Sequence, residues 1–336
     1  MRRIGLTYKG NFSCVHPRAR QRGEGKSAAD PALGCGAVID PRYDGATTGA
    51  MGLGGEMKGR LQNWPLRRLG LAAAGVMIGV ACAAAQEAPV AEIRPGVLPG
   101  YLPKTALPDS LALLPPPPAE GSAALALDEA VARADLALQG GARWKLAAMD
   151  ADLSFPWAAG DFACALNAPV TQADTPRLYQ MLRRALSDAG ASTGAAKEHY
   201  QRARPFMENK QPTCSPGAES DLAKNGSYPS GHTAIGWTWA LILAEIAPER
   251  SEAILARGRS FGESRLVCNV HWDSDVIEGR FLADGTVAEL HADPTFLADL
   301  AAAKGELAAV RAKNPPPQRD CKAEADALAG QPPQAP

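Results

Sequence analysis

The chain has 336 residues, of which 46% are hydrophobic and 21% are charged, and its formal net charge at pH 7 is −1. This balance is that of an ordinary globular protein with enough apolar material for a core. The charge is uneven, because residues 1–85 hold twelve Lys and Arg against five Asp and Glu, whereas acidic residues outnumber basic ones by eight in the rest of the chain. An acidic body argues against nucleic acid as a partner, because non-specific nucleic-acid binding requires positive surface.

Residues 57–85 have the pattern of a cleaved export signal. Four basic residues precede an apolar run of thirteen residues, 69–81, and three alanines that fit a small-x-small cleavage site follow. The run is shorter than the roughly 20 residues of a membrane-spanning helix, so we expect a periplasmic protein without stable membrane insertion. Two variants of export stay open, because Arg67-Arg68 hints at the twin-arginine route and Cys82 is a candidate for lipidation.

Residues 1–56 lie upstream of this signal, although such a signal normally begins a protein. They show no helical or strand period, and we interpret them as a non-native or disordered extension, with Met57 or Met51 as the true start. Residues 86–121 are rich in proline and predict an extended lead-in of polyproline character.

The pattern of apolar residues becomes helical after Ser122. Thr175 and Pro176 are typical of a helix start, as cap and first residue. No alternation of the kind found in β-strands is sustained, so we predict an all-α, single-domain helical bundle over 122–312, followed by a polar tail over 313–336. The predicted helices are 124–139, 175–190, 233–247, 251–265, 280–292 and 294–313.

The cysteines after the signal are even in number, which in an exported chain predicts disulfides. Four cysteines permit three pairings, and the sequence does not choose among them. Their spacing lacks the close pairs typical of metal sites, and we expect neither a metal nor another cofactor. The four are Cys164, Cys214, Cys268 and Cys321.

Three polar segments carry candidates for chemistry. In the first, Lys197 and Arg204 are seven residues apart, so that on a helix closed by Pro205 both cations would share one face. In the second, "PSGH" (229–232) directly precedes the apolar run 234–247. The first turn of a helix presents unpaired N–H groups and positive potential, and would here attract an anion. Either Ser230 or Thr233 could cap this helix.

The third segment holds Ser264-Arg265 and, further on, His271 and Asp275. The last two are four residues apart, so on a helix the carboxylate can accept from one imidazole nitrogen and leave the other free. Each segment alone has an ordinary structural explanation. Together they supply two guanidinium groups, an ammonium, a hydroxyl and two histidines, a set suited to binding a tetrahedral oxyanion.

The order Lys-x6-Arg-Pro, Pro-Ser-Gly-His, Ser-Arg-x5-His-x3-Asp resembles the signature of the type 2 phosphatidic acid phosphatase and vanadium haloperoxidase superfamily. The form "GSYPSGHT" (226–233), together with a chain that has no membrane helix after the signal, resembles the class A bacterial non-specific acid phosphatases. The similarity in character runs from about Tyr101 to Lys313.

The resemblance implies a phosphatase that hydrolyses small phosphate monoesters through a phosphohistidine. His271 would be the nucleophile, Asp275 would orient it, and His232 would be the general acid and base. The phosphate oxygens would be held by five residues, namely Lys197, Arg204, Ser230, Gly231 and Arg265. A Cys214–Cys268 disulfide near the site would also be compatible with it.

The main alternative is a vanadate-dependent haloperoxidase, because the same kind of pocket can hold vanadate. A lipid phosphatase and a non-enzymatic phosphate-binding protein are weaker alternatives, and the sequence leaves a homo-oligomer open. We expect structural roles for the remaining candidates, namely His199, His291, Trp237, Trp239 and Trp272.

Overall fold

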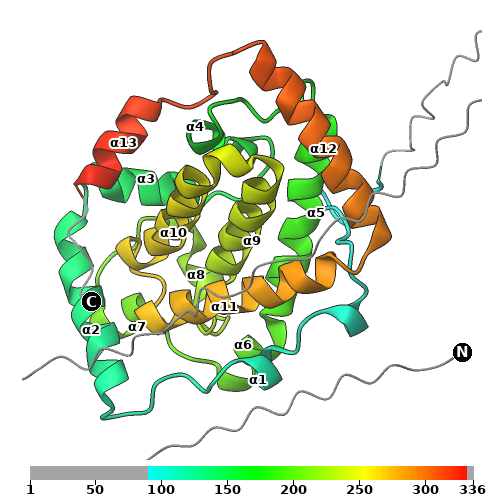
Figure 1. Cartoon of the computed structure of the whole chain (residues 1–336). Coiled ribbons are helices and arrows are strands. Elements are labelled where there is room, and N and C mark those ends of the chain that lie inside the picture. The colour runs from blue at the N-terminus through cyan, green and yellow to red at the C-terminus, as the bar shows by residue number, and fades with distance from the viewer. Residues whose placement is uncertain (1–89, 331–336) are drawn as a thin grey trace, which may run out of the picture. The chain divides into compact units, whose positions relative to one another are not determined.

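The computed structural model describes residues 90–330 (Figure 1); the predictions for the extension 1–56 and the export signal 57–85 lie outside them. Within 90–330 the chain is helical and has no β-sheet, only an isolated bridge between Arg94 and Val97. The prediction of an all-α fold is confirmed. The α-helices of this region are α1 Ser110–Leu113, α2 Ala123–Asp135, α3 Ala142–Asp150, α4 Ala163–Leu166, α5 Pro176–Ser192, α6 Gly194–Tyr200, α7 Pro205–Asn209, α8 Glu219–Leu222, α9 Gly231–Ile246, α10 Ser251–Val267, α11 Asp273–Leu290, α12 Pro294–Ala312 and α13 Cys321–Ala329.

The long helices coincide closely with the predicted ones. The clearest difference at a boundary is in α11, which begins at Asp273 although the apolar period became visible only from residue 280. The segment expected as a polar tail carries α13, whose N-cap Asp320 accepts from the backbone N–H of Lys322 and of Ala323. Such a short helix has little stability alone, and its packing against α3 stabilises it.

Helix α9 lies at the centre of the bundle, in contact with α5, α10, α11 and α12 (Figure 1). It is apolar on nearly all sides, as a fully surrounded helix must be, and Trp239, Ile242 and Leu243 have no exposed surface. Contact with α10 is close because Gly236 has no side chain; a Cβ there would lie 2.2 Å from the Phe261 ring.

Close packing brings the end of α10 and the start of α11 against the N-terminus of α9. A Cβ on Gly262 of α10 would lie 2.8 Å from the Thr233 side chain, and one on Gly279 of α11 would lie 2.7 Å from the Ser230 carbonyl oxygen. The last turn of α10 and the first turns of α11 therefore lie against the N-terminus of α9. The candidate residues of the second and third segments meet there.

The two ends of the described chain are attached to the bundle by polar contacts and a disulfide. In the lead-in, the backbone N–H groups of Tyr101 and Leu102 donate to the Asp188 carboxylate of α5 at 2.8 and 3.1 Å. At the other end, Cys321 at the start of α13 is bonded to Cys164 of α4.

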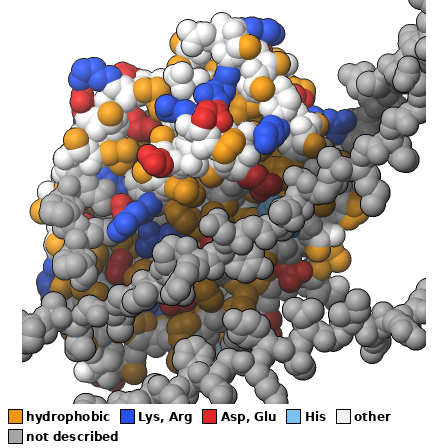
Figure 2. Space-filling model, in the orientation of Figure 1, with side chains coloured by type: hydrophobic (Ala, Val, Ile, Leu, Met, Phe, Trp, Pro, Cys, Tyr) orange, Lys and Arg blue, Asp and Glu red, His pale blue; other side chains and the backbone are white. Residues whose placement is uncertain are grey.

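Among residues 90–330 no helix combines the length and the apolar character needed to cross a membrane. On the uncovered part of the face drawn in Figure 2, acidic and basic side chains are intermixed, and neither sign forms a continuous surface.

Candidate active site

His271 and Asp275 form the contact that was expected, and the pair is buried, but the two residues do not lie on one helix. His271 lies before α11, Trp272 is the N-cap, and Asp275 is the third residue of the helix. The capping position explains the contact: Asp275 Oδ2 accepts from the backbone N–H of Trp272 at 3.0 Å and lies 3.1 Å from His271 Nδ1. The helical geometry considered for 271–275 does not hold, because the carboxylate turns back over the helix start, where the chain is still extended.

Arg204 contacts the other imidazole nitrogen of His271. Its Nη1 lies 3.0 Å from His271 Nε2 and also donates to the Val270 carbonyl at 2.9 Å. A guanidinium has no acceptor, so Nε2 must accept and Nδ1 must carry the proton that it donates to Asp275. The pair of contacts fixes one tautomer, with the lone pair of Nε2 directed at Arg204.

Lys197 and Arg204 do lie in one cluster, but the predicted continuous helix between them was wrong. Helix α6 ends at Tyr200, and Gln201 takes a left-handed conformation with φ 44°. Arg204 is extended and caps α7, so Pro205 starts a helix instead of closing one. The reversal at Gln201 carries Arg204 back toward the site that Lys197 borders.

Both cations are held by backbone carbonyls at the end of α8 and in the loop between α8 and α9. Lys197 Nζ donates to the Gly226 and Ser227 carbonyls at 2.8 and 3.1 Å. Arg204 Nε donates to the Leu222 carbonyl at 2.9 Å. These neutral acceptors orient the two cations without neutralising their charge.

Arg265, near the C-terminal end of α10, is almost completely buried, with 1% of its surface exposed. Its Nε and Nη1 have no hydrogen-bond partner. An unsatisfied buried guanidinium is costly, and a bound anion would satisfy it. Burial first, and then the neighbouring Arg204, lower the pKa of Arg265 to about 9.

The "PSGH" turn forms the N-terminus of α9. Ser230 is its N-cap: its hydroxyl accepts from the Thr233 N–H at 3.3 Å and from the Thr233 hydroxyl at 2.8 Å, so its own proton remains to be donated. The Cβ missing from Gly231 would lie 3.7 Å from Cε of Lys197, which places the backbone of this turn beside the ammonium group. His232 Nε2 lies 3.1 Å from the Ala151 carbonyl and, facing an acceptor, carries a proton.

The cluster has the electrostatics of an anion site. Burial and the nearby Arg204 lower the pKa of Lys197 to about 7, and burial lowers that of Arg204 to about 10. Burial, with the surrounding cations, also holds the pKa of His271 and of His232 well below the usual range. Each of these shifts disfavours positive charge, and a phosphate dianion would reverse them.

The structure adds residues that the sequence analysis missed. Arg202 and Asp128 contact Asp275 and its helix, and Asp150 accepts from the Ser264 hydroxyl at 2.6 Å. Arg202 was visible two residues before Arg204, but nothing in its spacing separated it from a surface cation. Asp128 and Asp150 lie 146 and 114 residues before their partners Ser274 and Ser264, and no local pattern signals such contacts.

Of the three pairings open to the four cysteines, the structure has Cys164–Cys321 and Cys214–Cys268. The second bond joins the segment after α7 to the end of α10, and the Cys214 N–H donates to the Cys268 carbonyl at 3.3 Å. Cys268 lies three residues after Arg265 and three before His271, so this bond braces the site.

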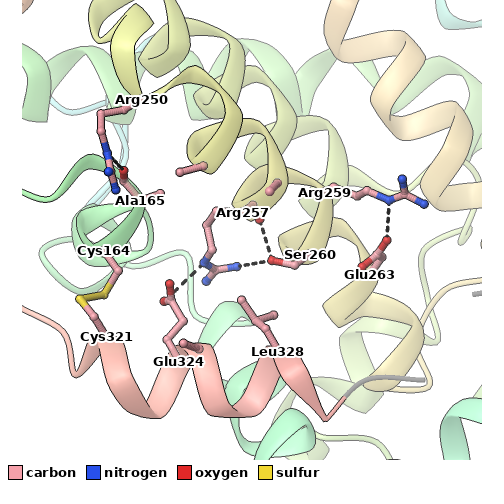
Figure 3. A pocket seen from close by; sticks show the side chains of 13 residues that line it. Cys164, Ala165, Arg250, Arg257, Arg259, Ser260, Glu263, Cys321, Glu324 and Leu328 are labelled. Atoms are coloured by element: carbon pink, nitrogen blue, oxygen red, sulfur yellow. Dashed lines mark hydrogen bonds and ion pairs between the residues drawn. A yellow bond between two sulfur atoms is a disulfide. The ribbon is translucent and has the colours of Figure 1, made fainter. Parts of the chain in front are cut away.

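The first disulfide borders a groove of about 620 Å³ between α10 and α13 (Figure 3). Arg257 of α10 crosses the groove and contacts Asp150 at 2.5 Å and Glu324 at 3.5 Å. The residues that line this groove include none of the predicted site residues.

The residues expected to be structural lie outside the cluster. His199 packs edge-on against Tyr200, and His291 Nε2 lies 2.9 Å from the Glu245 carboxylate. Trp239 is in the core, and the indole N–H of Trp237 donates to Asp284 at 2.9 Å. Trp272 differs in that it caps α11 beside Asp275.

The chain is similar to known proteins over this same region. Residues 182–293 match the PAP2 superfamily. The non-specific acid phosphatase of Providencia stuartii is 45% identical over 212 residues, which cover 63% of this chain and 86% of that protein. The acid phosphatase of Zymomonas mobilis is 42% identical over 220 residues, covering 65% of this chain and 83% of that protein. The non-specific acid phosphatase of Salmonella typhimurium is 42% identical over 195 residues, covering 58% and 78%.

The span that matches the superfamily contains every predicted site residue, from Lys197 to Asp275. High identity over most of the length of several relatives leaves little room for a different architecture. The chain belongs to the PAP2 superfamily and, within it, to the class A bacterial non-specific acid phosphatases.

Proposed function

We propose that this protein hydrolyses small phosphate monoesters of broad range, with His271 as nucleophile and His232 as general acid and base. The observation that carries the proposal is the fixed tautomer of His271, whose Nε2 lone pair points into a cluster of cations. A protein that only bound phosphate would have no use for a carboxylate that orients this imidazole.

In the first step, Nε2 of His271 attacks phosphorus, and the bond from phosphorus to the ester oxygen breaks. His232, protonated when the phosphate dianion is bound, gives a proton to the departing oxygen, and the product alcohol leaves. The positive charge on the phosphorylated imidazole is balanced by Asp275, which accepts the Nδ1 proton in a hydrogen bond.

In the second step, water attacks the phosphohistidine. His232, now neutral, takes a proton from that water, the bond from phosphorus to nitrogen breaks, and inorganic phosphate is released. Both steps pass through a five-coordinate phosphorus whose equatorial oxygens gather negative charge. Lys197, Arg204 and Arg265 would bind these oxygens, together with the Ser230 hydroxyl and the Gly231 N–H.

We also propose that the protein works in the periplasm. The support is the signal pattern at 57–85 and the two disulfides of the folded region, which form and persist in oxidising compartments. A protein that stayed in the cytoplasm would be expected to carry these cysteines as thiols.

The experiment is a substrate profile of the purified protein on nucleotides, sugar phosphates, aryl phosphates and phosphatidate, with and without EDTA. Turnover of the first three classes in EDTA supports the proposal, because side-chain cations would supply the positive charge. Loss of turnover in EDTA and its return with added Mg²⁺ or Zn²⁺ would contradict it. A parallel assay with vanadate, bromide and hydrogen peroxide tests the haloperoxidase alternative, and halide oxidation in place of hydrolysis would favour it.

A further inference from the structure

The second oxygen of the Asp275 carboxylate is held by an arginine outside the family signature. Arg202 Nη1 donates to Asp275 Oδ1 at 2.7 Å, while Oδ2 serves His271 and the Trp272 N–H. Asp275 has no exposed surface, and the Arg202 side chain is only 10% exposed. The contact is therefore a buried ion pair directly behind the proposed nucleophile.

Arg202 is itself fixed from several sides. Its Nη2 donates to Asp128 Oδ2 of α2 at 2.7 Å, and its guanidinium lies over the Trp272 ring at 5.3 Å. Asp128 also accepts from the Ser274 N–H at 2.8 Å and from the Ser274 hydroxyl at 2.6 Å. Asp128, with 2% of its surface exposed, thus ties Arg202 to the first turn of α11.

The charges around Asp275 show why this arginine matters. Burial raises the pKa of Asp275, and Arg202 is the strongest influence opposing that rise, followed by the Trp272 N–H and Lys197. Arg204 and Arg265 face His271 from the other side. If Arg202 were removed, the carboxyl would gain a proton or turn away, and in either case the Nδ1 proton of His271 would lose its anionic acceptor.

We propose that Arg202, oriented by Asp128, is a positioning residue that keeps the Asp275 carboxylate aimed at His271 Nδ1 and thereby keeps Nε2 available for attack. This inference rests on the proposed function, since it assumes that His271 is the nucleophile. A purely structural role, in which Arg202 only joins α2 to the segment after α6, would affect stability but not the tautomer of His271.

The test compares Arg202→Ala with Arg184→Ala as a matched control. Arg184 is likewise a largely buried arginine, 13% exposed, which pairs with Asp299 and lies over the Tyr101 ring, but it contacts none of the site residues. We expect Arg202→Ala to lower kcat about 10- to 100-fold, the range for misplacement of a reacting group, with less than about a threefold change in the inhibition constant of phosphate. Arg184→Ala should lower the melting temperature without this loss of kcat.

Rescue makes the test specific. Guanidinium chloride at millimolar concentration should restore part of the kcat of Arg202→Ala, and sodium chloride at equal ionic strength should not. Asp275→Asn should show no rescue, because Arg202 is still in place and the carboxylate itself is missing. Arg202→Lys should retain more activity than Arg202→Ala, and Asp128→Asn should show a smaller loss of the same kind.

The tautomer can be observed directly by ¹⁵N NMR of the histidine side chains. Wild type should show a neutral His271 with the proton on Nδ1, and Arg202→Ala should show a mixture of both tautomers. An unchanged tautomer with wild-type kcat in Arg202→Ala, or a loss that only follows the melting temperature as in Arg184→Ala, would overturn the inference. His271→Ala separates the two proposals: if that variant keeps its activity, the proposed nucleophile is wrong, whereas if it is inactive while Arg202→Ala behaves as wild type, only the role of Arg202 fails.

Discussion

Arg204 donates to His271 at Nε2, the nitrogen that has to attack phosphorus in the proposed mechanism, across 3.0 Å. The contact holds the lone pair in place, and it must break before that nitrogen bonds to phosphorus. A phosphate ester offers Arg204 negatively charged oxygens, which are stronger acceptors than a neutral imidazole. Substrate binding would thus move the guanidinium from the nucleophile to the phosphate oxygens and release the lone pair at the moment when it is needed.

Removing the nucleophile and removing its orienting carboxylate should have different effects. We expect His271→Ala to lose essentially all turnover and Asp275→Asn to remain folded with a rate loss of roughly 10²- to 10⁴-fold, since an amide permits the wrong tautomer. Circular dichroism checks folding, and trapping of ³²P from a labelled substrate by an alkaline quench, in which phosphohistidine is stable, locates the phosphoenzyme. Label on His232 in place of His271 would reverse the assignment of the two histidines.

The importance of His232 should depend on the leaving group. A sugar alkoxide needs a proton to depart, whereas nitrophenolate leaves readily without one, and general acid catalysis contributes about 10²- to 10⁴-fold where it is needed. We therefore expect His232→Ala to reduce kcat/KM far more for a sugar phosphate than for nitrophenyl phosphate. Because His232 would also activate water in the second step, kcat alone could hide the difference, and kcat/KM or a pre-steady-state burst is the proper measurement. Equal losses for both substrates would show that His232 binds phosphate and donates no proton.

Anion binding should be coupled to proton uptake near neutral pH. Burial and Arg204 lower the pKa of Lys197 to about 7, and an anion beside the ammonium would raise it. Just above pH 7 the bound state therefore carries more protons than the free state, and affinity falls as the pH rises through this range. Sulfate is the suitable probe, because it does not itself titrate near pH 7.

Calorimetry of sulfate binding at pH 7.5, in two buffers with different ionisation enthalpies, measures this uptake. The wild-type enthalpies should differ between the buffers, and in Lys197→Met the difference should become much smaller. Identical enthalpies for the wild type in both buffers would mean that no group in the site changes its charge when the anion binds.

The two disulfides should differ in their effect on activity. Cys214–Cys268 closes a loop of 54 residues, for which the chain-entropy model gives about 4 kcal/mol of stabilisation, and Cys164–Cys321 closes a longer one of 157 residues. Replacing either pair by serine should lower the free energy of unfolding measured in denaturant. Only the Cys214–Cys268 replacement should also lower kcat well below wild type, because Val270, whose carbonyl holds Arg204, lies two residues after Cys268. A larger loss of kcat in the Cys164–Cys321 variant would contradict the inference that the Cys214–Cys268 bond holds the site residues in place.

Much of this protein could be predicted from local sequence. The periodic placement of apolar residues predicted the long helices of residues 122–312, because a helix must bury one face and repeats every 3.6 residues. Ser230 was identified among two candidate caps for a similar reason, since the turn before α9 needs an acceptor for its first N–H groups. The chemistry of the three polar segments and their resemblance to the superfamily signature predicted which side chains would gather at one site.

The local conformation of those residues was decided by tertiary structure. Lys197 and Arg204 meet through a left-handed residue at Gln201 instead of along a helix face, and His271 meets Asp275 across a helix start. A spacing of four or seven residues is compatible both with a continuous helix and with these non-helical arrangements. Only the packing of α6, α9 and α11 selects the non-helical ones.

The contacts behind the site lie beyond any local pattern. The sequence determined which side chains are available to bind a phosphate, because their chemistry and order are read directly from the chain. Tertiary structure alone placed Asp128 beside Arg202 across 74 residues, paired Cys214 with Cys268, and left two nitrogens of Arg265 unpaired in the interior. These relationships depend on which helices pack together, and that is set by the whole core and not by neighbours in the sequence.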